Sequence, residues 1–250
     1  MTVERHEYCA LALADAFRGD GEILASPIGN LPTIAARLAK LVFEPGLLLT
    51  DGVATLLAEV PPIGVGAAIM AEGFMPYRSV FDVVWSGRRH VIMGASQIDR
   101  YGNQNICAIG DYRRPAAQLL GMRGAPGNTI NHPTTYWIPQ HSKRVFCAKV
   151  DVVSGVGYDR ARALGPSARF HEIRRVVSNL GVFDFATPDR TMRLASVHPG
   201  VRIEDVVENT GFELVLPPEI PPTRSPTQEE LRLLREVLDP KGLGKKELLQ

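Results

Sequence analysis

Residues 22–52 read EILASPIGNLPTIAARLAKLVFEPGLLLTDG, and this stretch decides the fold class. Glu22–Ser26 predicts a strand that ends in a turn at residues 27–30. In Leu31–Val42 the apolar residues recur at the i, i+4, i+7 and i+8 positions of one helical face; they are Ile34, Leu38, Leu41 and Val42. Gly46–Thr50 is typical of a buried parallel strand. Strand, helix and strand at this spacing predict an α/β fold with an open, mostly parallel sheet.

Elements on both sides of this stretch continue the alternation. Arg5–Arg18 predicts a helix that buries Cys9, Leu13, Ala16 and Phe17. Further strands are predicted at His90–Met93, Asn105–Ile109, Val145–Asp151, Arg174–Val177, Gly181–Phe185 and Thr191–Val197. Ile203–Asn209 predicts a helix that ends at Gly211, a residue suited to the left-handed conformation.

The C-terminal part, residues 216–250, predicts a surface tether followed by a helix. Five prolines lie between Leu216 and Pro226, which is typical of an extended connection. Thr227-Gln228-Glu229-Glu230 matches a capping box at the start of the last helix. Because the middle of the chain contains no linker and no repeat, residues 1–250 predict a single domain.

Composition excludes several classes of protein. The 250 residues carry 28 Lys+Arg and 27 Asp+Glu, so the formal charge is 28 − 27 = +1. No basic excess is available for general nucleic-acid binding. Apolar runs fall well short of the ~18–20 residues of a membrane span, and the N-terminus lacks a secretory pattern. Three scattered cysteines, Cys9, Cys107 and Cys147, fit buried thiols in a reducing compartment. We therefore predict a cytoplasmic protein with no membrane partner.

A first polar cluster follows the predicted strand His90–Met93. Residues 94–105 read GASQIDRYGNQN and bring Asp99, Asn103 and Asn105 within seven positions. Such residues commonly bond to their own backbone in a tight turn. The functional alternative is that the amides surround a polar ligand, and the spacing leaves both interpretations open.

A second cluster spans residues 123–132, RGAPGNTINH. Gly124 and Gly127 allow close backbone approach and can direct N–H groups into one concavity, as an oxyanion hole requires. Arg123 and His132 flank the loop as an anion clamp and a proton carrier. A purely structural loop would contain the same glycines. The pattern matches neither a Rossmann motif nor a P-loop.

Other motifs carry less chemistry. Val177–Phe185 predicts a hairpin, and the remaining histidines, His141 among them, lack metal-ligand spacing, which predicts surface or capped core residues and no metal site. The basic pairs are expected on solvated faces, although one could meet the phosphates of a cofactor; they are Arg88-Arg89, Arg113-Arg114, Lys143-Arg144 and Arg174-Arg175. No Gly-x-Ser-x-Gly elbow is present, so the chain offers no self-contained nucleophile.

Taken together, these landmarks resemble the β subunits of family I CoA-transferases. The set also includes the segments Val176–Phe185, His198–Val201 and Glu208–Phe212, and it keeps the family order. The resemblance implies an open α/β fold of the CoA-transferase type. It also implies a separate α subunit, a heterotetramer, and an active site between the two chains, without a resident cofactor.

The chain departs from the transferase pattern at the nucleophile. Transferases of this family carry a catalytic glutamate after an early strand, whereas this chain reads Leu49-Thr50-Asp51-Gly52-Val53. Asp51 is one methylene shorter, and a displacement of about 1 Å can cost ~10²-fold in rate. Pro126-Gly127-Asn128 also stands where the family favours Gly-Gly-Ala. Covalent CoA transfer with Asp51 as the nucleophile is thus an alternative hypothesis for this chain.

Within this family the chain is most similar to the ring-cleaving branch. The resemblance implies hydrolysis of a C–C bond in the last steroid-derived ring, in a β-oxo cyclohexene carboxyl-CoA thioester. The α subunit would supply the general base. This chain would supply catalytic Arg123, Gly124, Gly127 and Asn128, with substrate-binding Asn103, Asn105, Asn131, His132 and Asp51. A third hypothesis is a non-catalytic scaffold subunit.

Overall fold

The computed structural model describes residues 2–66 and 69–248. The chain divides into two compact units: Met1–Met93 with Arg224–Gln250, and Gly94–Thr223. The expectation of one domain over residues 1–250 stays a prediction.

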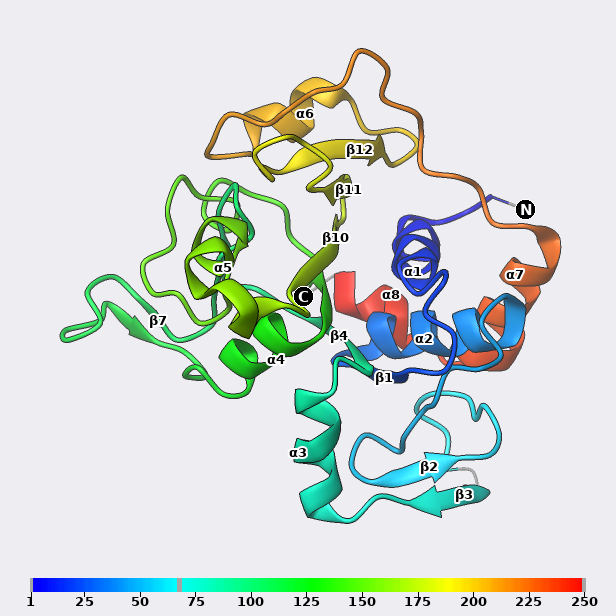
Figure 1. Cartoon of the computed structure of the whole chain (residues 1–250). Coiled ribbons are helices and arrows are strands. Elements are labelled where there is room, and N and C mark those ends of the chain that lie inside the picture. Colours follow the sequence, from blue (N-terminus) through cyan, green and yellow to red (C-terminus); the bar gives the residue numbers. More distant parts are fainter. Residues whose placement is uncertain (1, 67–68, 249–250) are drawn as a thin grey trace. The chain divides into compact units, whose positions relative to one another are not determined.

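The first unit is built on helices from both ends of the chain (Figure 1). Helix α1 (Arg5–Asp15) packs on α2 (Asn30–Val42), and both contact α8 (Leu243–Leu248). Strand β1 (Leu24–Pro27) pairs in parallel with β4 (Arg89–Met93). Leu24 also forms a parallel bridge with Leu48, next to buried Leu47 and Leu49. The expected strand and helix are thus confirmed, whereas Gly46–Thr50 forms isolated bridges at Leu48 and Thr50 instead of the expected strand.

Smaller elements complete this unit. The remaining ones are the antiparallel strands β2 (Thr55–Leu57) and β3 (Ala71–Phe74), helices α3 (Tyr77–Trp85) and α7 (Gln228–Arg232), and the π-helical segment η2 (Leu233–Leu238). Thr227 caps α7 as predicted, because its side chain accepts from the N–H of Glu230 over 3.1 Å and Glu230 bonds back.

The second unit contains four strands in the order β9-β10-β11-β12. They are β9 (Pro133–Ile138), β10 (Glu172–Ser178), β11 (Gly181–Asp184) and β12 (Arg193–Val197). The pair β9–β10 is parallel, and the two pairs that follow are antiparallel. The hairpin predicted over Val177–Phe185 is confirmed, since Val176 pairs with Phe183. Together with the parallel pair β1–β4, this arrangement confirms the α/β class.

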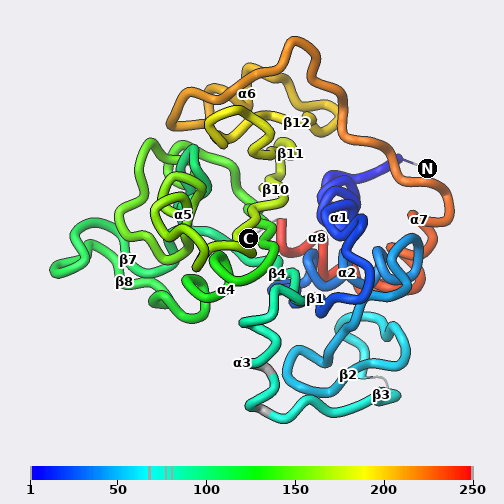
Figure 2. The backbone as a smooth tube through the Cα atoms, viewed as in Figure 1, coloured from blue at the N-terminus to red at the C-terminus, as the bar shows by residue number. Residues whose placement is uncertain are grey.

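Short elements surround these strands. Two hairpins are formed by β5 (Gln97–Ile98) with β6 (Gln104–Asn105), and by β7 (Ala108–Ile109) with β8 (Ala117–Gln118). Figure 2 shows the β7–β8 hairpin as a narrow loop that extends away from the other elements of its unit. The helices are α4 (Ala125–Asn131), α5 (Tyr158–Leu164), η1 (Gly165–Ala168) and α6 (Ile203–Glu208).

Several predicted details are wrong. The expected strand Asn105–Ile109 is divided between β6, which ends at Asn105, and β7. Leu41 and Val42 are 44% and 41% exposed, because the core face of α2 includes Leu31 and Ala35 instead. Residues 145–151 form no strand and contribute one bridge, between Phe146 and Ile98. Gly211 does not adopt a left-handed conformation, since its φ is not positive. A Cβ there would lie 2.6 Å from the carbonyl oxygen of Phe146, so the constraint at Gly211 is close packing.

Candidate functional site

The first polar cluster forms a buried network around Asp99, at the tip of the β5–β6 hairpin. One carboxylate oxygen of Asp99 accepts from the N–H groups of Tyr101 and Asn103, both over 3.0 Å. The other accepts from Nδ2 of Asn103 over 2.9 Å. Burial raises the pKa of Asp99, against the effect of these hydrogen bonds. The tight-turn interpretation of this cluster is therefore realised in the structure.

The amides of Asn103 and Asn105 are engaged within the chain. Nδ2 of Asn103 also donates to Asp159 over 2.9 Å, and its Oδ1 accepts from Gly157 over 2.8 Å. Nδ2 of Asn105 donates to Oε1 of Gln97 over 2.7 Å, while its Oδ1 accepts from the N–H of Cys107 over 2.9 Å. Both side chains are nearly inaccessible. These bonds fix the hairpin, and contact with substrate stays a prediction for both residues.

The second cluster forms the helix α4 where a loop was expected. Gly124 is its N-cap, Pro126 occupies the first turn, and Gly127 lies inside it. Arg123 precedes the helix with φ +50°, a left-handed conformation that costs a non-glycine residue about 1–2 kcal/mol. Its side chain is exposed, and its Nε donates to the carbonyl oxygen of Leu120 over 3.1 Å. This turn directs Arg123 outward, as an anion clamp requires.

The backbone donors in this cluster are fewer than the sequence indicates. Pro126 has no N–H, and the N–H of Ala125 donates to Met122 over 3.1 Å. The N–H of Asn128 donates to Gly124 over 2.9 Å. Gly124 and Gly127 therefore remain as the residues whose N–H groups can serve a developing oxyanion.

The C-terminal part of this cluster lies deeper in the fold. Asn128 and His132 are buried, and His132 directly precedes β9. Asn131 is half-buried, and its Nδ2 donates to the carbonyl oxygen of Gly127 over 2.8 Å. Roles for these three side chains in substrate binding or catalysis stay predictions.

Sequence reasoning missed the segment Ser154-Gly155-Val156-Gly157, which connects the two clusters. The N–H of Val156 donates to Oγ1 of Thr129 in α4 over 2.9 Å. The adjacent Gly157 donates to Asn103, as described above. A Cβ on Gly155 would lie 2.7 Å from Oε1 of Gln104 and 3.0 Å from Cγ2 of Thr129. Two glycines spaced by one residue were the available signal for this close approach.

Asp51 lies in the first unit and caps its own turn. Its Oδ1 accepts from the N–H groups of Val53, Ala54 and Thr55 over 2.9, 3.0 and 3.2 Å. The bond from Val53 contributes most to lowering the pKa of Asp51. Its side chain also borders a cavity of about 300 Å³ that Arg37 lines. The carboxylate is therefore held as an anion by backbone donors.

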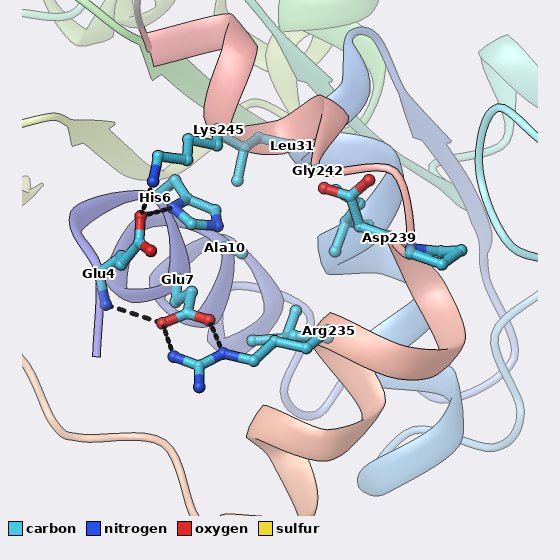
Figure 3. A pocket seen from close by; sticks show the side chains of 12 residues that line it. Glu4, His6, Glu7, Ala10, Leu31, Arg235, Asp239, Gly242 and Lys245 are labelled. Carbon is cyan, nitrogen blue, oxygen red and sulfur yellow. Dashed lines mark hydrogen bonds and ion pairs between the residues drawn. The ribbon is translucent and has the colours of Figure 1, made fainter. Parts of the chain in front are cut away.

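A second cavity of the first unit, of about 290 Å³, lies where α1 meets the C-terminal helices (Figure 3). The Arg235 guanidinium contacts both carboxylate oxygens of the buried Glu7, at 2.5 and 2.8 Å. Lys245 pairs with Glu4 at 2.7 Å, and Glu4 lies 3.7 Å from His6. Because its charges pair with one another across the cavity, this cluster serves to join the two ends of the chain.

The sequence predicted that His141 is either a surface residue or a capped core residue, and the structure shows a capped core residue. Its Nδ1 and Nε2 lie 3.0 and 3.1 Å from the hydroxyls of Ser178 and Thr210. Its ring stacks on Phe146 at 3.7 Å. Burial lowers its pKa to about 3. His141 is therefore neutral, and among residues 2–66 and 69–248 its ring nitrogens bond to hydroxyls and to no carboxylate of the kind that activates a catalytic histidine.

No helix among residues 2–66 and 69–248 has the length and apolar character needed to cross a membrane. Within the same residues, no three His, Cys, Asp or Glu side chains gather into a metal-binding group.

The sequence and the structure are both similar to known proteins. The Coenzyme A transferase family pattern matches residues 75–209. The chain is 58% identical to the cholesterol ring-cleaving hydrolase IpdB subunit of Rhodococcus jostii, over 98% of this chain and 96% of that protein. It is 54% identical to the IpdB subunit of Mycobacterium tuberculosis, over 98% of both. The crystal structure of Rhodococcus jostii IpdAB superimposes with a TM-score of 0.94, at 58% identity and 99% coverage of both chains.

Proposed function

Because this chain belongs to the coenzyme A transferase family, we propose that it is one subunit of a cholesterol ring-cleaving hydrolase that acts on a CoA thioester. The observation that carries this proposal is the 58% identity to the Rhodococcus jostii IpdB subunit over nearly the full length of both chains. The fold agrees closely with that of IpdAB. The partner is accordingly the α subunit of the same enzyme, an IpdA-like chain.

The chemistry of C–C hydrolysis fits what this chain contains. Water adds to a ketone that is β to the thioester, and its oxygen bonds to the carbonyl carbon while a base takes its proton. The alkoxide then re-forms a carbonyl, the ring C–C bond breaks, and the electron pair moves to the carbon next to the thioester. That carbanion is stabilised by the thioester and takes up a proton. The reaction therefore needs a base and oxyanion donors but no acyl-enzyme.

We assign the oxyanion donors to the start of α4. The N–H groups of Gly124 and Gly127 are the candidates, and exposed Arg123 supplies a guanidinium beside them. Asn128 anchors the turn through its N–H bond to Gly124. The general base belongs to the partner subunit. In this assignment the chain stabilises negative charge while the α subunit removes a proton from water.

The geometry at Asp51 favours hydrolysis over covalent CoA transfer. The side chain of Asp51 is exposed, but its Oδ1 already accepts three backbone N–H groups. Hydrogen bonds to the ionised form stabilise it and lower its nucleophilicity.

Co-expression with the partner α subunit tests the proposal. The purified complex is expected to open the ring of a cyclic β-oxo acyl-CoA with uptake of one water, while neither subunit alone turns over. Borohydride treatment during turnover, followed by intact mass measurement, is expected to leave this chain unmodified. Reduction of the Asp51 carboxyl to an alcohol, the product expected from a thioester between this side chain and CoA, would establish the transferase instead, and full activity after loss of Arg123 would favour the scaffold hypothesis.

A further inference from the structure

A basic hollow in the second unit is lined by none of the residues 123–132. It encloses about 500 Å³ and lies beside the β5–β6 hairpin. Lys143, Arg144 and Lys149 supply three cationic side chains to its lining, and Asp151 supplies one carboxylate. The net charge of the lining is therefore 3 − 1 = +2. The three cations are exposed at its edge.

These cations are not neutralised by the chain. Within residues 2–66 and 69–248, Lys143, Arg144 and Lys149 take part in no ion pair. Oδ2 of Asp151 accepts instead from Nε2 of Gln97 and the N–H of Gly110, over 3.0 and 2.9 Å. Two other arginines of this unit are neutralised by carboxylates, because Arg193 pairs with Asp184 and Arg174 pairs with Glu172. The hollow thus presents positive charge that the described carboxylates of this chain do not neutralise.

The turn that carries the cations is fixed by backbone hydrogen bonds. The carbonyl of Val145 accepts from Ile98 over 2.7 Å, and the N–H of Cys147 donates back to Ile98 over 3.0 Å. On the other side, the N–H of Gly211 donates to Phe146 over 2.7 Å. The close approach of Gly211 leaves no room for a Cβ against this turn. The cations therefore project from a preorganised backbone, which reduces the entropic cost of binding.

The same hairpin connects the hollow to the predicted substrate residues. Gln97 lines the hollow, pairs with Asn105 across β5–β6, and accepts from its Nδ2 over 2.7 Å. A ligand held in the hollow would therefore contact the hairpin that carries Asn103 and Asn105.

Resting on the proposed function, we propose that this hollow binds the phosphate groups of the substrate's CoA moiety, through Lys143, Arg144 and Lys149. CoA carries a diphosphate and a 3′-phosphate, so it places several negative charges far from the reacting thioester. Lysine and arginine near a hollow of this volume match that charge. Ser96 and Ser142 also line the hollow and add hydroxyl donors for phosphate oxygens.

The test uses the assembled complex and two matched double variants. Lys143→Ala/Arg144→Ala removes two charges from the hollow, and Arg113→Ala/Arg114→Ala removes two from an exposed pair that does not line it. Each exposed ion pair contributes a few-fold to binding affinity. Because the first variant loses two of them, we expect it to raise KM for the acyl-CoA and Kd for free CoA by about tenfold. We expect kcat to change less than about twofold, and the control to match wild type.

Truncated ligands separate the sources of binding. The pantetheine thioester of the same acyl group lacks the phosphates, so its KM is expected to be equal in wild type and variant. Inorganic phosphate is expected to bind far more weakly than CoA; equal affinity would show a general anion site and overturn the proposal. Lys143→Arg is expected to retain wild-type Kd for CoA, because it keeps the positive charge, and an unchanged KM of the double variant for the pantetheine thioester excludes a folding defect.

Failure of this inference and failure of the proposed function give different results. If the Lys143→Ala/Arg144→Ala complex opens the ring with unchanged KM and binds CoA with unchanged Kd, the phosphate site is wrong and the hydrolase stands. If the wild-type complex opens no ring, but the Kd for CoA is about tenfold higher in the variant than in wild type, the proposed hydrolase function is wrong and the phosphate site stands.

Discussion

The N–H of Gly157 donates to Oδ1 of Asn103 over 2.8 Å, across 54 positions of sequence. The contact joins the start of α5 to the hairpin that contains Asp99. It is possible only because residue 157 has no side chain. Gly157 thereby fixes the amide of a predicted substrate residue in a network that reaches α4 through Val156 and Thr129.

Gly157→Ala is expected to destabilise the protein by about 1–3 kcal/mol, as overpacking of a core does. An added Cβ would lie 2.6 Å from the backbone N of Asn103 and 2.6 Å from the carbonyl oxygen of Tyr101, so the backbone must move. Urea unfolding measures the change. Gly66→Ala is the control, since no atom lies within 4 Å of its Cβ position, and we expect a change within about 0.5 kcal/mol. Equal stability of both variants would disprove the close approach.

Arg123→Ala is expected to lower kcat of the assembled enzyme by roughly 10²-fold, the scale for loss of one oxyanion-stabilising donor. Folding should be retained, since the side chain is exposed and donates to Leu120 alone among the described contacts. Steady-state kinetics on a β-oxo acyl-CoA measures the effect. Arg113→Ala removes an equally exposed charge elsewhere and should leave kcat unchanged. Full turnover by Arg123→Ala would refute the assignment of this turn to catalysis.

His141 is expected to make stability depend on pH. Burial lowers its pKa to about 3, below the roughly 6.5 of an unfolded chain. The unfolded state therefore binds more protons, and the stability from neutral His141 is lost as the pH falls below about 6.5. At pH 5 this amounts to about 2 kcal/mol.

His141→Gln keeps hydrogen-bonding groups and should flatten the dependence between pH 7 and pH 5, as measured by urea midpoints. Buried carboxylates whose pKa is lowered, such as Glu230, titrate at more acidic pH, so they contribute little to the pH dependence between pH 7 and pH 5. His6 and His171 also have pKa values lowered by burial, so part of the slope should remain. An unchanged slope in His141→Gln would contradict the buried neutral state of this residue.

Arg235→Met is expected to cost about 1–3 kcal/mol, because it leaves the buried carboxylate of Glu7 without its cation. Burial raises the pKa of Glu7, but the Arg235 guanidinium and the Glu4 N–H outweigh it and hold the pKa below its usual value. The stabilisation is thus present above pH ~4.5 and lost as the pH falls. The difference between variant and wild type should accordingly narrow towards pH 3.

Arg232→Ala is the matched control for this pair. Arg232 pairs with Glu229 on the exposed face of the same helical segment, and such pairs contribute at most about 0.5 kcal/mol. Thermal or urea unfolding compares the two variants. If Arg235→Met costs no more than Arg232→Ala, the junction in Figure 3 does not hold the chain ends together.

Local sequence signals predicted where helices and strands form more accurately than they predicted which faces of these elements are buried. The capping box at Thr227 is confirmed because both of its hydrogen bonds form within four residues. The predicted buried face of α2 was wrong at Leu41 and Val42. Neighbouring elements decide which side of a helix is buried near its end. The strand expected at residues 145–151 also failed, since the chain there bonds to Ile98 and Gly211 in a turn.

Local patterns in the chain were sufficient to predict the α/β class, the pairing of Arg174–Val177 with Gly181–Phe185, and the polar residue types of the two clusters. Periodicity, caps and turn residues act over a few positions, so they can be read without the fold. The folded structure was needed to show that the amides of Asn103 and Asn105 are hydrogen-bonded to Asp99, Gly157 and Gln97. It also decided that Lys143, Arg144 and Lys149 share a hollow without carboxylate partners. The reason is that hydrogen-bond partners and unbalanced charge are set by groups distant in sequence, which meet only when the chain folds.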